Sequence, residues 1–299
     1  MTAKNGRQVW LAHLGLVVVV LVWGTTFVVV KNALRDASTL LFLAVRFSLA
    51  SLALAIIFRK ECTSWRALRP GLRGGLIAGF LLFCSYFFQT VGLRYTTASK
   101  SAFITALSIV AVPLIAALVY KSVPQVTEVA GVAVAAAGLG LMTFESTRFE
   151  MNFGDWMTVL CALAFAAQVV VVGHYSTEVG VGVLSFTQVG LVALISLGSF
   201  SWAETPRIAW SPGLLIALAV TALLATALAF PVQAWAQRYV SPTRTALILA
   251  LEPVFASVVA YVWASERLSA RGMAGGALIV AGVVLAELKP ARGERHPNR

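Results

Sequence analysis

Two ionisable side chains lie deep inside apolar stretches of this sequence. Arg46 is about seven residues into the run 39–58, and Glu252 is about nine residues into the run 243–264. A charged side chain at the centre of a membrane helix costs at least ~2.5–3.5 kcal/mol, so each position is a candidate functional site. A guanidinium can bind a carboxylate through two parallel hydrogen bonds, whereas a desolvated carboxylic acid can exchange a proton. The chemistries indicated are anion binding and proton coupling.

Structural roles compete with both interpretations. Arg46 is also compatible with snorkelling, or with hydrogen bonds to the backbone of a neighbouring helix. Glu252 is also compatible with a packing or capping role beside Pro253, whose missing N–H leaves a carbonyl one turn earlier without its helical partner. The sequence leaves these alternatives open.

Neutral polar and aromatic residues occur at spacings that place them on shared helix faces. Trp23 and Thr26 are three residues apart, as are Tyr86 and Gln89. For each residue taken alone, hydrogen bonding between membrane helices is the competing role. As a set, we expect them to line a cavity near the membrane midplane. The predicted substrate-binding residues are Trp23, Thr26, Arg46, Tyr86, Gln89, Gln168, Gln188 and Gln233, with Thr105, Phe165, Phe230 and Trp235 as further candidates and Glu252 as the coupling residue.

The composition excludes a water-soluble domain. Of 299 residues, 59% are hydrophobic and only 12% are charged, whereas a soluble domain carries about 25% charged residues. The mean hydropathy is +0.86. The net charge of +11 would suggest nucleic acid in a soluble protein, but here the basic residues lie between apolar runs. We therefore interpret them as determinants of topology and of anionic-lipid binding, with no nucleic-acid partner.

The apolar residues fall into ten runs of about the length that crosses a bilayer as a helix. The sequence therefore predicts an all-α membrane protein with ten transmembrane helices and the lipid bilayer as its environment. The runs cover 10–30, 39–58, 74–93, 101–120, 126–144, 156–173, 182–202, 212–235, 243–264 and 272–288.

The distribution of Lys and Arg predicts the orientation. With the N-terminus inside, the inner segments carry 14 of these residues and the outer segments carry 8, and cytoplasmic loops carry the excess. The predicted loop 59–73 supplies most of that excess. We expect both termini on the cytoplasmic side of the membrane, with a disordered basic tail at 289–299.

The two halves of the chain are similar to each other. At an offset of 144 residues, segment 94–102 aligns with segment 238–246, and both begin with Arg-Tyr. At an offset of 142, the first two runs align with the sixth and seventh, which places Arg46 on Gln188. Because each copy has five helices, the second copy must enter the membrane from the opposite side. The sequence therefore predicts inverted-topology repeats at 10–144 and 156–288, an architecture in which substrate binds between the copies.

Paired glycines mark the last helix of each repeat. Gly131 and Gly138 align with Gly275 and Gly282 without a gap, and glycine allows helices to approach closely. We expect these two helices to pack away from the substrate, and they are candidates for the seam of a homodimer.

Several motifs resemble a known family. Trp23-Gly24-Thr25-Thr26-Phe27, Arg46-Phe47, the segment 93–98 and Leu251-Glu252-Pro253-Val254 resemble the EamA-type branch of the drug/metabolite transporter superfamily. The resemblance covers nearly the whole chain. It implies ten helices, cytoplasmic termini and transport, often export, of small metabolites such as amino acids across a bacterial inner membrane.

The resemblance and the absence of a phosphate-binding G-x-x-x-x-G-K-[S/T] motif favour a secondary transporter of a small-molecule substrate over an ATP-driven one. The three histidines show no metal-ligand spacing, and we expect neither a metal nor a cofactor. A non-transporting membrane scaffold and an intramembrane enzyme are the alternatives. An enzyme is disfavoured because no protease-like pair of catalytic residues stands out.

Overall fold

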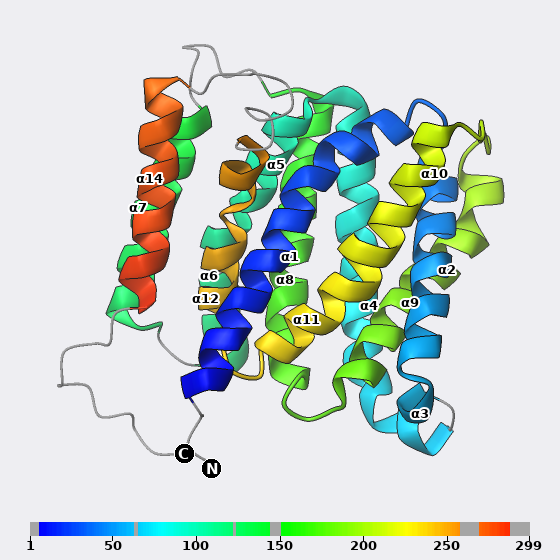
Figure 1. Cartoon of the computed structure of the whole chain (residues 1–299), viewed down its shortest axis with the longest axis horizontal. Coiled ribbons are helices and arrows are strands. Elements are labelled where there is room, and N and C mark those ends of the chain that lie inside the picture. The colour runs from blue at the N-terminus through cyan, green and yellow to red at the C-terminus, as the bar shows by residue number, and fades with distance from the viewer. Residues whose placement is uncertain (1–5, 63–64, 122–123, 144–150, 258–268, 288–299) are drawn as a thin grey trace.

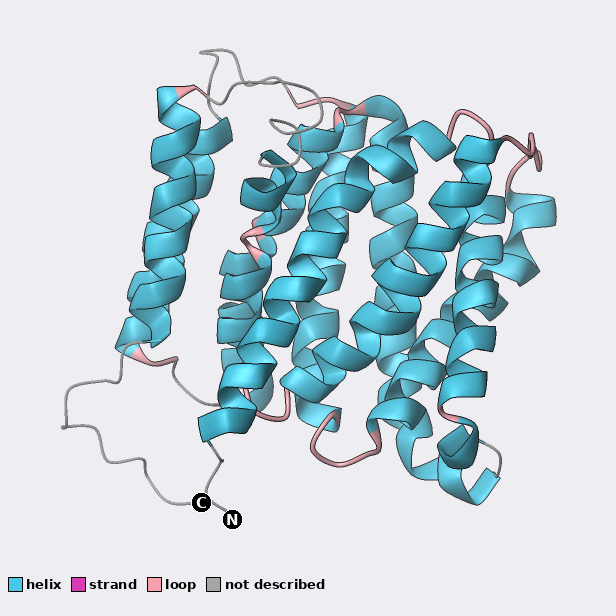
Figure 2. Ribbon diagram, in the orientation of Figure 1, coloured by secondary structure: helices cyan, strands magenta, loops and turns pink. Residues whose placement is uncertain are grey.

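The computed structural model describes residues 6–62, 65–121, 124–143, 151–257 and 269–287, and these form long helices that stand side by side (Figure 1; Figure 2). In chain order the helices are α1 (Gly6–Ala33), α2 (Thr39–Ile57), α3 (Arg59–Cys62), α4 (Trp65–Tyr95), α5 (Ala98–Ala106), α6 (Ser108–Tyr120), α7 (Val126–Thr143), α8 (Phe153–Tyr175), α9 (Val181–Ala203), α10 (Pro212–Ala219), the π-helix η1 (Val220–Leu228), α11 (Ala229–Ala236), α12 (Pro242–Leu249) and α14 (Ala270–Glu287).

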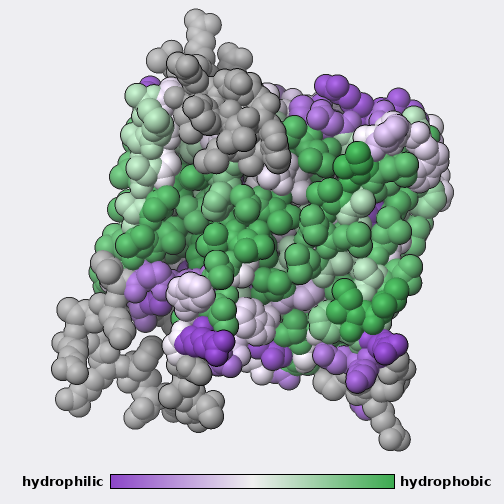
Figure 3. All heavy atoms as spheres, viewed as in Figure 1, coloured by the Kyte–Doolittle hydropathy of each residue, from purple (hydrophilic) through white to green (hydrophobic). Residues whose placement is uncertain are grey.

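The surface has the character of a membrane protein. Apolar side chains form a broad band across the middle of the molecule, and hydrophilic residues gather at its upper and lower edges (Figure 3). Four exposed tryptophans lie near helix ends, where amphipathic rings sit at the headgroup level; they are Trp10, Trp156, Trp202 and Trp210. Within the described part of the chain, eight helical stretches are long and apolar enough to cross a membrane, and Val126–Met142 is a shorter apolar helix. The chain is a multi-pass membrane protein.

These elements correspond to nine of the ten predicted runs. The other run, 243–264, contains α12 and a helical segment at 252–257, and its last residues lie outside the described part of the chain. The predicted tail at 289–299 also lies outside it.

The described residues of the expected loop at 59–73, which are 59–62 and 65–73, are helical instead. The short helix α3 follows α2, and α4 already begins at Trp65. Arginine, lysine and leucine are good helix formers, so a basic segment can continue a helix beyond the apolar region. The Lys and Arg residues were used to predict orientation, and they gave no information on the backbone conformation of this segment.

Helix interruptions recur at equivalent places in the two halves. The fourth predicted run is divided at Leu107 between α5 and α6, and the ninth is divided at Ala250 and Leu251 after α12. At the offset of 144, Leu107 aligns with Leu251. The preceding helix starts match as well. The Thr97 hydroxyl oxygen accepts from the backbone N–H of Lys100 at the start of α5, and that of Ser241 accepts from the backbone N–H of Arg244 at the start of α12.

Arginines hold equivalent turns in the two halves. Arg94 donates to Leu34 O at 3.2 Å and to Ala37 O at 2.8 Å, across the turn between α1 and α2. Arg238 donates to the carbonyls of residues 176 and 179, both at 2.7 Å, across the turn between α8 and α9. The second pair of carbonyls lies 142 residues after the first, which is the sequence offset of these two helix pairs.

The paired glycines bring α7 and α14 into close contact within one chain. A Cβ added at Gly138 would lie 2.6 Å from Gly275 O, and one at Gly131 would lie 2.6 Å from Gly282 O. The two helices stand together at one edge of the molecule (Figure 1). The glycine faces therefore serve a contact inside the chain, and a homodimer would need a different surface.

Candidate functional site

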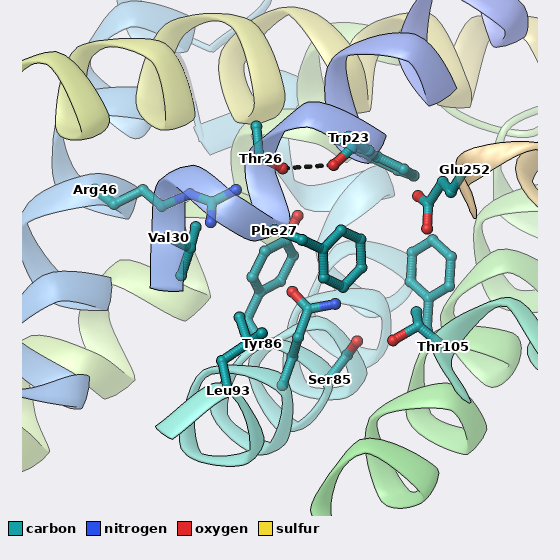
Figure 4. A pocket seen from close by; sticks show the side chains of 12 residues that line it. Trp23, Thr26, Phe27, Val30, Arg46, Ser85, Tyr86, Leu93, Thr105 and Glu252 are labelled. Atoms are coloured by element: carbon teal, nitrogen blue, oxygen red, sulfur yellow. Dashed lines mark hydrogen bonds between the residues drawn. The ribbon is translucent and has the colours of Figure 1, made fainter. Parts of the chain in front are cut away.

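A small polar cavity lies among the first, second, fourth, fifth and eighth helices and the break after α12 (Figure 4). Its accessible volume is about 30 Å³, enough for roughly two water molecules. The lining residues are Trp23, Thr26, Phe27, Val30, Arg46, Ser85, Tyr86, Gln89, Leu93, Thr105, Phe165 and Glu252.

Arg46 is fixed by neutral partners. Its side chain is only 2% exposed, and Nε and Nη2 donate to Thr226 Oγ1 at 3.2 and 3.1 Å. The guanidinium carbon lies 4.5 Å from the ring centroid of Tyr86 and 5.2 Å from that of Phe47. Cation–π contacts of this kind contribute ~2 kcal/mol or more when desolvated. Aromatic rings and a hydroxyl thus stabilise the cation without neutralising it.

Glu252 reaches the same cavity from the second half of the chain. It is 5% exposed and immediately follows the helix break. Gly24 of α1 allows this break to approach, because a Cβ there would lie only 2.9 Å from Glu252 O. Figure 4 shows Arg46 and Glu252 on opposite sides of the cavity, with Phe27 between them. The ion pairs found among the described residues include neither of the two.

An aromatic cluster lies beside these charged groups. The ring of Trp23 lies 5.6 Å from that of Phe165 and 5.5 Å from that of Phe230, measured between centroids. The ring centroids of Tyr86 and Phe47 lie 5.0 Å apart in an edge-to-face arrangement. Apolar walls with charges at opposite sides are suited to a small amphipathic molecule.

Of the predicted site residues, the structure places Trp23, Thr26, Arg46, Tyr86, Gln89 and Glu252 at the cavity. The remaining three residues are Gln168, Gln188 and Gln233, which are buried and hydrogen-bonded to one another. Gln233 Nε2 donates to Gln168 Oε1 at 3.4 Å, and Gln168 Nε2 donates to Gln188 Oε1 at 3.0 Å. Gln188 Nε2 and Gln233 Oε1 have no hydrogen-bond partner among the described residues.

These three glutamines are the sequence counterparts of cavity residues. At the repeat offsets Gln168, Gln188 and Gln233 align with Thr26, Arg46 and Gln89. The same three positions therefore line a cavity in one half and form an amide chain in the other.

The sequence alone gave no reason to select Phe27, Val30, Ser85, Leu93 or the Arg46 partner Thr226. Each is apolar or a small hydroxyl, and such residues occur throughout membrane helices as packing groups. The spacing of Thr226 five residues after Thr221 carries no signal either, because hydroxyls commonly bond their own helix.

The fold and cavity define a class: a polytopic helical membrane protein with charged side chains in a buried central site. The sequence model of the EamA-like transporter family matches residues 10–144 and 152–288. The chain belongs to this family.

Individual relatives are similar along nearly the whole chain. An uncharacterized transporter of Archaeoglobus fulgidus is 35% identical over 278 residues, covering 93% of this chain and 86% of the relative. The uncharacterized transporter YoaV of Bacillus subtilis is 20% identical, covering 91% and 95%. A solved crystal structure with 17% identity superposes with a TM-score of 0.77, covering 92% of this chain and 96% of that one. At that identity the structural likeness concerns the fold alone.

Proposed function

We propose that this chain is a secondary transporter that exports amino acids, or closely related amphipathic solutes, across the bacterial inner membrane. The observation that carries the proposal is the presence of Arg46 and Glu252 in one buried cavity without an ion pair between them. A zwitterion offers a carboxylate to the guanidinium and an ammonium to the carboxylate. Its side chain would meet the aromatic rings of Trp23 and Tyr86.

The cavity must open for such a solute to enter. Its volume of about 30 Å³ is far below the ~300–1,000 Å³ of sites that hold drug-sized ligands. The conformation described is therefore a closed one in the proposed transport cycle.

Inverted five-helix repeats and ten membrane spans are part of the proposal. Arg94 and Arg238 bind carbonyls at matching repeat positions, which supports a duplicated unit. The two units start at opposite edges of the molecule, α1 at the lower edge and α8 at the upper edge of Figure 1, which supports inversion. Movement of one repeat against the other would expose the cavity alternately to each side.

The amide chain is the proposed second part of the solute path. Gln168, Gln188 and Gln233 bond to one another in this closed conformation, and two of their polar atoms have no hydrogen-bond partner among the residues that the structure describes. An unpaired buried polar group costs ~1–3 kcal/mol, which favours a rearrangement that supplies a partner. We propose that the three amides bind the solute when the halves rearrange.

Glu252 is the proposed coupling group. It is buried at the cavity and far from the ends of its predicted span. Binding a proton in exchange for the solute would allow an inward proton gradient to drive export. The charge bias supports cytoplasmic termini, and α1 begins at the edge where α14 ends (Figure 1).

Uptake into everted membrane vesicles tests the function. Vesicles with the wild-type chain, with Arg46→Gln, or without the chain would be incubated with a pool of ¹⁴C-labelled L-amino acids. We expect saturable uptake of at least one amino acid by the wild type and a strong reduction in the variant. Correctly folded wild-type chain that transports none of them would refute amino-acid export.

A further inference from the structure

The π-helix η1 contacts two residues of the candidate site. Trp23 Nε1 donates to Ala225 O at 2.9 Å, and Arg46 donates through two nitrogens to Thr226 Oγ1. Trp23 belongs to α1 and Arg46 to α2, so two helices of the first half are anchored on neighbouring residues of one segment in the second half.

The π-helical geometry explains why these acceptors are available. An α-helix would bond Ala229 N–H to Ala225 O, four residues earlier. Here Ala229 N–H donates to Leu224 O and Thr226 O, which leaves Ala225 O for the indole of Trp23. π-Bulges are frequent at functional sites.

The same geometry orients the hydroxyl of Thr226. Its proton goes to Thr221 O, five residues earlier, at 2.7 Å, whereas a threonine in an α-helix reaches the carbonyl three or four residues earlier. With its proton bound to the backbone, the oxygen offers lone pairs to Arg46. Thr226 is fully buried, so this acceptor is held in one direction.

Thr226 covers one of the two edges of the guanidinium that can bind a carboxylate. Nε and Nη2 form the side edge, which Thr226 contacts, and Nη1 and Nη2 form the end edge. The rings of Tyr86 and Phe47 lie near the guanidinium carbon at 4.5 and 5.2 Å. A carboxylate that binds Arg46 in this arrangement must therefore approach end-on.

Building on the function proposed above, we propose that Thr226 is a positioning residue that presents the end edge of Arg46 to the solute carboxylate. The π-helix thereby determines the preference for solutes that carry a carboxylate. Thr226 itself contacts Arg46 and not the solute.

Transport by purified protein in proteoliposomes tests this role. Thr226→Val removes the hydroxyl oxygen that accepts from Arg46 with little change in shape, and Thr226→Ser retains it. Thr226→Ala also removes the oxygen, with a smaller side chain, and serves as a second variant. Thr187→Val is the matched control, because its buried hydroxyl donates within α9 to Val183 O and Leu184 O. The probe is the L-amino acid with the largest wild-type flux, and the competitor is its carboxamide analogue.

We expect Thr226→Val to raise KM about tenfold with little change in kcat. It should also reduce the preference for the amino acid over its amide, because end-on presentation of Arg46 is lost. Thr226→Ser should restore both, and Thr187→Val should leave both at wild-type values. Unchanged KM and unchanged amide discrimination in folded Thr226→Val, or in folded Thr226→Ala, would overturn the proposal.

A second measurement does not depend on any solute. In protein labelled with ¹⁵Nε-arginine, the Arg46 signal is identified by its loss in Arg46→Lys, and we expect it to shift and narrow in Thr226→Val. An unchanged signal would refute positioning, even if transport changed. If the wild type transports no amino acid, the proposal of amino-acid export fails and with it the selectivity role, while this spectrum still decides whether Thr226 holds Arg46.

Discussion

Adding one methyl group to Gly275 tests the contact between α7 and α14. A Cβ there would lie 2.5 Å from Gly138 O and 2.8 Å from Met142 N. Both are backbone atoms, so no side chain can rotate away. The two helices would have to separate by about 1 Å before the contact reached ordinary van der Waals distance.

Gly276 provides a control one residue away in the same helix. A Cβ at that position would meet Val254 at 3.8 and 4.0 Å, which is ordinary contact. Both substitutions to alanine add the same methyl to the interior of α14, so the gain in helix propensity cancels. The difference in unfolding free energy is then the overpacking cost alone, ~1–3 kcal/mol.

Equilibrium unfolding in mixed micelles with increasing dodecyl sulfate, followed by circular dichroism, measures this difference. We expect Gly275→Ala to unfold at a lower detergent fraction than the wild type and Gly276→Ala at the same or a higher one. Equal stability of the two variants would show that α7 and α14 do not approach as closely as described, and would refute the reasoning.

Three further predictions concern polar groups. Glu252→Gln should weaken solute binding without abolishing it, because the amide oxygen can still accept a hydrogen bond from the solute ammonium, and it should lose the acceleration of uptake that an acidic lumen gives wild-type everted vesicles; a variant that still responds to the gradient would make Glu252 structural. Lys100→Met should lower the unfolding free energy by ~2 kcal/mol, because losing the 2.6 Å ion pair leaves the buried Asp155 carboxylate without its cation, and adding Asp155→Asn should recover part of the loss in the same detergent titration. Trp23→Phe should destabilise the protein by ~1–3 kcal/mol by leaving Ala225 O without its indole partner, and unchanged unfolding would contradict that assignment.

The apolar runs predicted most helices because hydrocarbon thickness constrains their length and composition together. Arg46 and Glu252 could be selected because a charge in an apolar run is energetically costly, and both line the same cavity. Their proximity could not be derived from their positions, since they are separated by most of the chain. Only tertiary packing brings α2 to the break after α12.

The π-helix at Val220–Leu228 was not predictable from the same reasoning. Hydropathy measures how apolar a segment is, and one extra residue in a helical turn does not change that. Thr226 was missed for the same reason, since its role depends on a bond to a carbonyl five residues earlier. The glutamines were selected for their polarity, but polarity alone cannot distinguish an amide that faces a cavity from one that bonds to another amide.

The arginine contacts at the two equivalent turns have a consequence for the order of biosynthesis. The hydrogen-bond donor to the Ala37 carbonyl is Arg94, 57 residues later in the chain. The donor to the Ser176 carbonyl is Arg238, 62 residues later. At ~5–20 residues per second, the ribosome needs roughly 3–12 s to deliver each arginine. During that interval the hairpin of the first two helices in each half lacks its final hydrogen bonds. Each hairpin is therefore completed only after the third predicted span of its half has been synthesised. The same step, in which an arginine binds the turn of an earlier hairpin, occurs once in each half.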